Sequence, residues 1–387
     1  MLTALIATLQ CTLGHSKTFA GSEIIYTKYN NYVIFKNSFF HLIHGQDLYK
    51  YYLAEQWDLY KYSPSFSFLF GTLVYLPDAI GLLLWNLLNV IPVLYGLKLL
   101  STISNRNKSY ILLFCLIESL NSLQNAQSNG LMAALILLTF TSLEKRKYFL
   151  ATLFVVLSVF LKIYGGIAFV FFIFYPDKAK LVLYTLFWFV FIGVLPLLVI
   201  SMNQLIYLYK SWGDLLQDDQ AQSIGISVSG IISTWFNIAV SKSVISVLAI
   251  IIFLSPLIRV KSWLSDNFRF MMLCSALIWV VIFNHKAESP TFIIAQMGIA
   301  LWYFSQEKSR VNTVLVIMAF IFTTLSVSDL TPRFIRYGFV DPYCIKAVMP
   351  VIIWCKIIWE LWMSKFVRVA DEGTAGLYQA GFTQSSS

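Results

Sequence analysis

The sequence of 387 residues has few charged side chains and lacks the motifs of a soluble nucleotide-hydrolysing enzyme. Charged side chains make up 12% of the chain, roughly half the fraction usual in soluble domains. It has neither a glycine-rich phosphate loop nor a cluster of residues at metal-ligand spacing, which argues against a nucleotide-hydrolysing module. We therefore expect neither a metal ion nor a cofactor. The five cysteines have no paired spacing, so we interpret them as small core residues and not as a disulfide framework.

What the sequence has in excess is apolar and aromatic surface. Hydrophobic residues make up 58% and aromatic residues 17% of the chain, and the mean hydropathy is +0.72. These values predict a multi-pass membrane protein whose partner is the lipid bilayer, with aromatic belts at two interfaces and rings on which sugars can stack. The net charge of +9 comes from short basic clusters between apolar runs. That is the positive-inside pattern, so we do not expect nucleic acid as a partner.

The apolar runs predict an all-α, polytopic membrane bundle of about 11–13 spans. Residues 1–368 then form one integral-membrane domain, and residues 369–387 form a disordered polar tail. Pro64–Leu76 is too short to cross alone and is either a span or a re-entrant piece. Tyr148–Tyr175 is too long for one helix and is interrupted by Lys162 and a glycine pair, so we expect a hairpin or a broken helix there.

The basic clusters assign the two faces of this bundle. The clusters near residues 106–108, 145–147, 178–180, 259–269 and 308–310 predict the cytoplasmic face. The opposite face receives a helical first extracytoplasmic loop at residues 14–63 and a second large loop at residues 202–243. It also receives the turns at residues 121–130 and 284–290. Most of the polar residues that could carry chemistry are therefore expected outside the cytoplasm.

The first loop contains two aspartates, each followed by Leu-Tyr: Asp47 and Asp58. One interpretation is that Asp47 is a catalytic general base acting on a sugar hydroxyl. Asp58 would then line a sugar or phosphate pocket together with Tyr49, Lys61 and Tyr62. The alternative is that both aspartates cap short interfacial helices and that the tyrosines belong to the membrane interface.

The segment Phe283–Pro290 places ionisable residues between two apolar runs. Such residues are costly near lipid unless they face water or a cavity. We interpret Glu288 as a second candidate acid or base, and His285, Lys286 and Ser289 as binding residues for a phosphate leaving group. The alternative is a solvated turn in which Ser289-Pro290 begins the next helix.

Amides and one lysine complete the set of candidates. Asn125, Gln127 and Asn129 end one apolar run and begin the next, where they either hydrogen-bond sugar hydroxyls or cap the helices. Lys162 stands alone in an apolar run near the predicted outer tip. It either binds the phosphate of an anionic lipid or extends its ammonium group to the interface.

Several local strings resemble glycosyltransferase family 87. They are Gly-x-Asp-x-Tyr at Gly45–Tyr49, Tyr-x-Tyr-x-Pro at Tyr60–Pro64, Leu76-Pro77, and Leu-Trp-x-Leu-Leu-Asn at Leu84–Asn89. The resemblance implies a C-type membrane glycosyltransferase in the bacterial cytoplasmic membrane with its site on the extracytoplasmic side. It implies transfer of a hexose, in the first place mannose, from a polyprenyl-phosphate donor to a glycolipid or glycan acceptor, with inversion.

One departure from the family pattern bears on catalysis. Relatives place an acidic residue soon after the first helix, whereas this chain has Asn30 and Asn31 there. An amide cannot act as a base, so the role falls to Asp47 or Glu288 unless the activity is lost or changed. The remaining alternatives are a transporter or flippase for lipid-linked sugars and a protein like an O-antigen ligase or polymerase. Against a transporter, we find no internal repeat.

Overall fold

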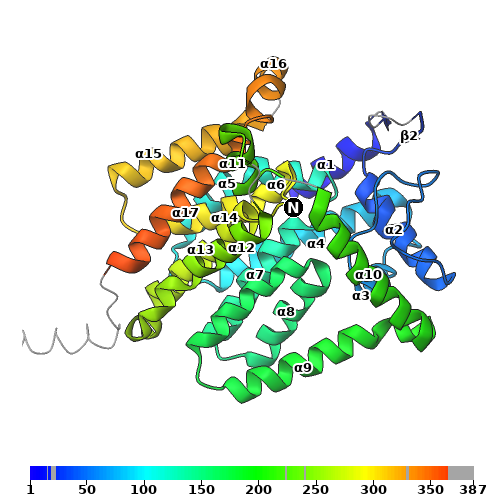
Figure 1. The fold of residues 1–387 in the computed structure, drawn as a ribbon, viewed down its shortest axis with the longest axis horizontal. Helices are drawn as coiled ribbons and strands as arrows, with labels where there is room; N and C mark the ends of the chain where they lie inside the picture. Colours follow the sequence, from blue (N-terminus) through cyan, green and yellow to red (C-terminus); the bar gives the residue numbers. More distant parts are fainter. Residues whose placement is uncertain (15, 19–22, 223–224, 239–240, 328–330, 365–387) are drawn as a thin grey trace, which may run out of the picture.

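The chain folds into an assembly of α-helices with one small antiparallel hairpin, as the computed structural model shows (Figure 1). The structure describes residues 1–14, 16–18, 23–222, 225–238, 241–327 and 331–364. The predicted tail at residues 369–387 therefore lies outside the described residues. The hairpin pairs β1 (Lys17–Thr18) with β2 (Ile25–Tyr26). The prediction of an all-α fold is confirmed apart from these four residues.

The first half of the chain contains the helices α1 (Leu2–Thr12), α2 (Asn30–Ile43), α3 (Pro64–Phe70), α4 (Asp78–Leu99), α5 (Asn105–Phe114), α6 (Leu116–Gln124), α7 (Asn129–Glu144), α8 (Tyr148–Leu161) and α9 (Lys178–Val194), with the 3-10 segments η1 (Ile163–Phe174) and η2 (Leu195–Leu198). The second half contains α10 (Met202–Gln222), α11 (Val228–Phe236), α12 (Lys242–Leu254), α13 (Asp266–Ile282), α14 (Phe292–Phe304), α15 (Arg310–Ala319), α16 (Arg333–Ile335) and α17 (Ile345–Met363). Between them lie the 3-10 segments η3 (Ser255–Ile258), η4 (Val260–Leu264), η5 (Ser289–Thr291) and η7 (Leu325–Val327) and the π-helical segments η6 (Phe320–Thr324) and η8 (Arg336–Val340).

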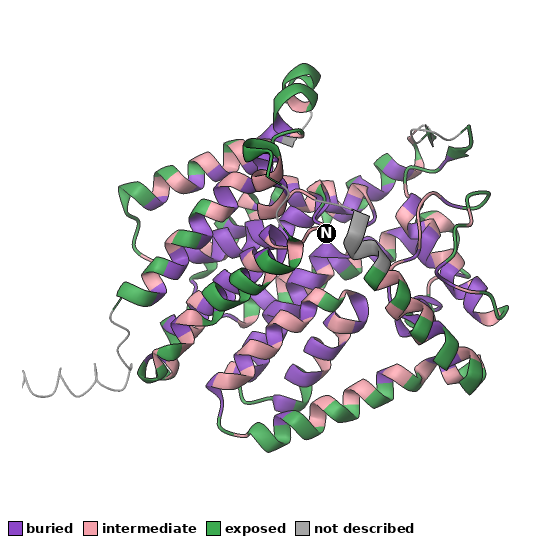
Figure 2. Cartoon of the chain, in the orientation of Figure 1, coloured by how far each residue is buried: buried purple, intermediate pink, exposed green. Residues whose placement is uncertain are grey.

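Burial separates central from peripheral helices (Figure 2). Nearly every side chain of α7 and α14, and most of those of α13, are buried. By contrast, α9 buries only Leu181 and Ile192, although most of its exposed side chains are apolar. An exposed apolar face of this kind suits contact with lipid. Figure 1 shows α9 along the lower edge of the molecule, with α10 returning from its far end toward the centre.

Two stretches of helix are long and apolar enough to cross a bilayer by themselves, at Asp78–Leu99 and Lys178–Leu198. Seven further apolar helices in the described ranges are shorter. The number of 11–13 spans stays a prediction. The predicted interruption of Tyr148–Tyr175 is confirmed: α8 ends at Leu161, Lys162 is extended with φ −150°, and η1 begins at Ile163.

The second large loop, predicted at residues 202–243, is mostly helical. Its first half is α10, which has 21 residues, and α11 follows. Polar residues dominate the composition of α10, but Leu205 and Leu208 are buried on one face. Apolar residues spaced three apart on a helix share a face, which is enough to dock an otherwise polar helix on the protein.

The turns of the bundle gather at two ends. At one end, Arg269 pairs with Glu144 at 2.6 Å, and Asn107 Nδ2 donates to the carbonyl of Phe304 at 2.8 Å. At the other end, Asn121 Nδ2 donates to Ser289 Oγ at 3.1 Å. Helix α7 runs from Asn129 to Glu144 between the two ends, a length of about 24 Å. Arg269 and Asn107 therefore lie at the end of the bundle opposite the turn that holds Asn121 and Ser289. The assignment of the two ends to the faces of a membrane stays a prediction.

Trp85 holds the first loop against α4 and gives a test of this packing. Its ring contacts Phe35, Phe66 and Phe70 with centroids 5.3–6.0 Å apart, and its Nε1 donates to the carbonyl of Ala126 at 2.9 Å. We expect Trp85→Ala to destabilise the purified protein by about 3–5 kcal/mol, seen as a lower Tm in detergent. The matched control is Leu84→Ala on the same helix, whose side chain is exposed. An equal loss of Tm in both variants would contradict this account.

Candidate functional site

A polar cluster forms where four segments meet at one end of the bundle. They are the end of the first loop at Tyr62, the turn between α6 and α7, the break after α8 at Lys162, and the segment before α14 at Glu288. The local sequence determines where the helices begin and end here. Ala126 has a positive φ of 48° in the α6–α7 turn, and Ser63 caps α3 by accepting from Phe66 N at 3.1 Å. Four distant parts of the sequence thus supply side chains to one place.

Lys162 is the cation of this cluster. Its Nζ donates to Asn129 Oδ1 at 2.9 Å and to Gln127 Oε1 at 3.4 Å. It also lies 5.6 Å from the ring centre of Tyr62 and 5.8 Å from that of Tyr164. The hydrogen-bonding partners are neutral amides, and the two rings offer their negative faces. Among the described residues, the cation is thus held in place by amides and has no carboxylate at contact distance.

Glu288 is the carboxylate of the cluster. Gln127 Nε2 donates to its Oε2 at 3.5 Å, so one amide side chain contacts both Lys162 and Glu288. The residue is exposed, and it caps η5 in a reciprocal arrangement with Thr291. The start of a helix at Ser289-Pro290 is confirmed. Glu288 therefore has a structural role as a cap and also presents an accessible carboxylate beside a bound cation.

Tyr62 closes the cluster from the side of the first loop. Its hydroxyl shares a hydrogen bond with Ser128 Oγ at 3.1 Å, and Tyr49 donates to its carbonyl at 3.0 Å. Burial raises the pKa of the Tyr62 phenol well above its usual range, so this hydroxyl stays protonated and can donate. The side chain of Tyr49 is buried, so we interpret Tyr49 as a residue that supports Tyr62.

Asn125 is placed differently from its neighbours. Its Nδ2 donates to Asn121 Oδ1 at 3.2 Å, and its carbonyl accepts from Asn31 Nδ2 at 2.8 Å. The carbonyl contact joins the α6–α7 turn to α2. The side-chain amide also donates to the carbonyl of Asn121 at 2.8 Å at the end of α6, as the capping alternative predicts. Gln127 and Asn129, by contrast, face Lys162.

Asp47 and Asp58 have their own partners. Asp47 accepts from Tyr49 N at 3.1 Å, Tyr207 OH at 2.9 Å and Ser211 Oγ at 3.1 Å. It thereby fastens the first loop to α10. Asp58 has a positive φ of 79° and pairs with Lys61 at 3.0 Å. Neither aspartate starts a helix, so their predicted capping of interfacial helices is wrong; both bond to local backbone N–H groups instead.

The segment that carries His285 and Lys286 is docked on the start of α11. Ile226 N donates to the carbonyl of Ala287 at 2.8 Å, and Lys286 N donates to Asn284 Oδ1 at 2.9 Å. A side chain at Gly225 would come within 2.4 Å of the His285 carbonyl, and the φ of this glycine is +58°. Gly225 therefore permits the close approach that fixes this segment next to Glu288.

Asn30 and Asn31, at the start of α2, both hydrogen-bond to backbone groups of other segments. Asn30 Nδ2 donates to the carbonyl of Trp57 at 2.7 Å, and Asn30 Oδ1 accepts from Trp57 N at 2.9 Å. Asn31 Nδ2 donates to the carbonyl of Asn125 at 2.8 Å. A carboxylate cannot donate to a carbonyl, so an aspartate at position 30 would lose half of the contact with Trp57. The amide at Asn30 thus has a structural reason.

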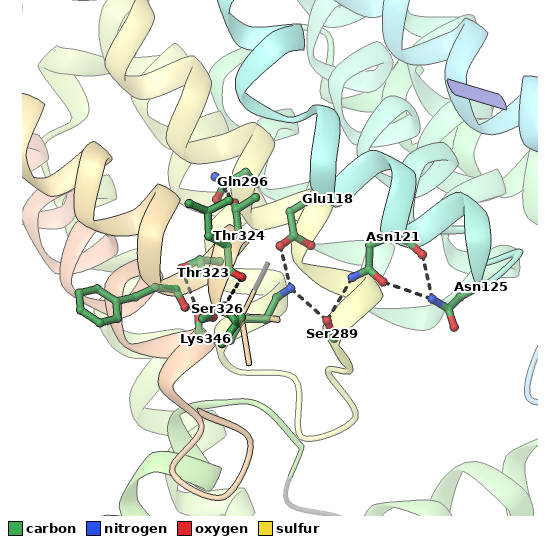
Figure 3. A network of polar contacts seen from close by, with 12 residues as sticks. Glu118, Asn121, Asn125, Ser289, Gln296, Thr323, Thr324, Ser326 and Lys346 are labelled. Carbon is green, nitrogen blue, oxygen red and sulfur yellow. Dashed lines mark hydrogen bonds and ion pairs between the residues drawn. The ribbon is translucent and has the colours of Figure 1, made fainter. Parts of the chain in front are cut away.

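Two residues that sequence reasoning missed lie next to the cluster, Glu118 and Lys346 (Figure 3). Lys346 Nζ lies 2.7 Å from Glu118 Oε1 and donates to Ser289 Oγ at 3.0 Å. Each stands alone in an apolar run more than two hundred residues from its partner. Two opposite charges in separate apolar runs are a weak signal of such a pair. Among the described residues, no group of three or more histidines, cysteines, aspartates or glutamates could hold a metal ion.

These features define a helical protein with lipid-compatible exposed faces and a polar cluster at one end. The chain matches the family model of glycosyltransferase family 87 over residues 60–283, more than half of its length. It therefore belongs to glycosyltransferase family 87, and the protein is a membrane glycosyltransferase. No curated protein matches the chain. The matched residues include Tyr62, Gln127, Asn129 and Lys162 but neither Asp47 nor Glu288.

Asp47 and Glu288 have different hydrogen-bond partners, and this difference gives a structural prediction. We expect Asp47→Ala to increase hydrogen exchange in α10 because Tyr207 and Ser211 lose their shared acceptor. Asp47→Asn should have a smaller effect, since one oxygen remains to accept. Glu288→Gln should leave exchange in α10 unchanged. Exchange in α10 that is the same for wild type and Asp47→Ala would show that Asp47 does not fasten this helix.

Proposed function

We propose that the protein transfers a hexose, in the first place mannose, from a polyprenyl-phosphate donor to a lipid-linked or envelope glycan acceptor, with inversion. The observation that supports this proposal is the connection of Lys162 and Glu288 through the side chain of Gln127. A cation that can hold a phosphate and a carboxylate that can accept a proton are the two groups that a single displacement requires.

The phosphate side of the proposal rests on Lys162. Its ammonium group is restrained by Asn129 and Gln127, so little reorganisation is needed when an anion arrives. A phosphate next to a desolvated cation forms a charge-assisted hydrogen bond, which is stronger than a bond between neutral groups. The same cation stabilises the charge that develops on the leaving polyprenyl phosphate.

The base side of the proposal rests on Glu288. Its carboxylate is accessible, whereas that of Asp47 accepts three hydrogen bonds within the protein. Glu288 takes the proton of an acceptor hydroxyl as that oxygen bonds to the anomeric carbon. The bond from this carbon to the phosphate oxygen breaks, and the phosphate leaves with the electron pair. Attack opposite the leaving group inverts the anomeric centre.

The remaining candidates fit around these two groups. Tyr62, Lys61 and Asp58 would border the sugar on the side of the first loop, and His285, Lys286 and Ser289 on the side of the segment before α14. Tyr49 would act by supporting Tyr62. Asn125 would act through the α6–α7 turn. The cluster lies at the end opposite the basic turns, so we place it at the extracytoplasmic face of the bacterial cytoplasmic membrane.

The assignment of the base is tested by conservative substitution. We expect Glu288→Gln to lower kcat by at least about 100-fold, the contribution of a general base, and Asp47→Asn to lower it by less than about 10-fold. The assay measures transfer of radiolabelled mannose or glucose from the polyprenyl-phosphate donor in membranes with and without the protein. The reverse order of the two variants would make Asp47 the base. No transfer by the wild type from either donor would overturn the proposed function.

The phosphate site is tested through the donor. Lys162→Met should raise the KM for the polyprenyl-phosphate donor by about 10-fold or more, because a charge-assisted hydrogen bond is lost. The KM for the acceptor should change little. Lys50→Met removes an exposed cation from the first loop and serves as the control, for which we expect wild-type kinetics. A Lys162→Met enzyme with an unchanged donor KM would place the phosphate elsewhere.

A further inference from the structure

The ion pair between Glu118 and Lys346 is the most deeply buried one among the described residues. Each side chain is at most 2% exposed, and the charged atoms are 2.7 Å apart. Glu118 lies on α6, within residues 60–283 that match the family model. Lys346 lies on α17, beyond these residues. Lys346 also lies 5.2 Å from the ring centre of Phe292 at the start of α14. The pair thus joins three helices directly behind the polar cluster.

The pair controls the hydroxyl of Ser289. Lys346 Nζ reaches Ser289 Oγ from one side and Asn121 Nδ2 reaches it from the other (Figure 3). An ammonium and an amide NH₂ can only donate, so the Ser289 oxygen accepts twice. Its own hydrogen then points away from both donors. The side chain of Ser289 is fixed in one rotamer, immediately next to Glu288 in the sequence.

Stability alone does not explain charges at these two positions. Replacing a buried ion pair with apolar side chains of similar volume is often neutral or stabilising, because both charges must be desolvated. An apolar pair would join α6 to α17 equally well. What an apolar pair cannot do is donate a hydrogen bond to Ser289.

We infer that Glu118 and Lys346 are positioning residues for the transfer reaction. Glu118 keeps Lys346 charged and oriented, and Lys346 and Asn121 fix Ser289. Ser289 is the first residue of η5, and Glu288 is the cap of that segment, so the position of Ser289 sets where the backbone of Glu288 lies. This inference rests on the proposed function, because it assigns Glu288 the role of base. Misplacement of a catalytic group by about 1 Å is sufficient to slow a reaction that depends on orientation.

The experiment removes both charges together, so that neither is left unpaired. In Glu118→Leu/Lys346→Met we expect a Tm near that of the wild type, a kcat lower by about 10-fold and an unchanged donor KM. Ser289→Ala should give the same loss of kcat.

The triple variant Glu118→Leu/Lys346→Met/Ser289→Ala tests whether Lys346 acts through Ser289. If it does, the triple variant should have a kcat no lower than that of the double variant or of Ser289→Ala, whereas independent effects would multiply to a loss of about 100-fold. The matched control is Glu360→Leu/Lys356→Met, which removes a second ion pair of 2.7 Å from α17.

The outcomes separate this inference from the proposed function. A kcat equal to that of the wild type in Glu118→Leu/Lys346→Met would overturn the positioning role while leaving the transfer reaction intact. Multiplicative effects in the triple variant would also overturn it, since Lys346 would then not act through Ser289. A similar loss of kcat in Glu360→Leu/Lys356→Met would also overturn it, because any loosening of α17 would then explain the loss. Absence of transfer by the wild-type protein would instead refute the proposed function.

Discussion

A charge that leaves water must find compensation inside the protein, and the polar end of this bundle is arranged around that constraint. Lys346 is compensated by Glu118, and this contact fixes how α6 and α17 lie beside the start of α14. Lys162 is treated differently, because its contacts are amides and aromatic rings. Lys346 thus has a carboxylate at contact distance, whereas Lys162 is contacted by neutral groups. This difference in partners is the basis for the phosphate-binding role proposed for Lys162.

Amide side chains make several of the contacts that join the segments around the polar cluster. Asn30 clamps Trp57, Asn31 holds the α6–α7 turn, and Gln127 links a lysine to a glutamate. An amide donates and accepts at once, and it costs less to bury than a charge. Asn30 in particular is a residue that the structure uses on both of its polar atoms. Catalysis in this chain is then expected to depend on a carboxylate from another segment.

The sequence predicted the parts of the site that depend on local signals. The amide-rich turn at Gln127 and Asn129, the break at Lys162 and the helix start at Ser289-Pro290 were all predictable from residue type and position. The all-α class followed from apolar runs of helical length. The sequence could not show that Lys162, Gln127 and Glu288 converge, because a shared location depends on how α7, α8 and α14 pack. The helical nature of residues 202–222 was hidden by their polar composition, and Glu118 and Lys346 carried no common local pattern.

The distance along the chain between Glu118 and Lys346 has a consequence for biogenesis. These partners are 228 residues apart, so the ribosome completes α6 long before it makes α17. During that interval Glu118 has no lysine to pair with, and a buried charge without a partner is costly. The ion pair can form only when α17 has been made. The contacts that hold Ser289 are therefore completed only after more than two hundred further residues have followed α6.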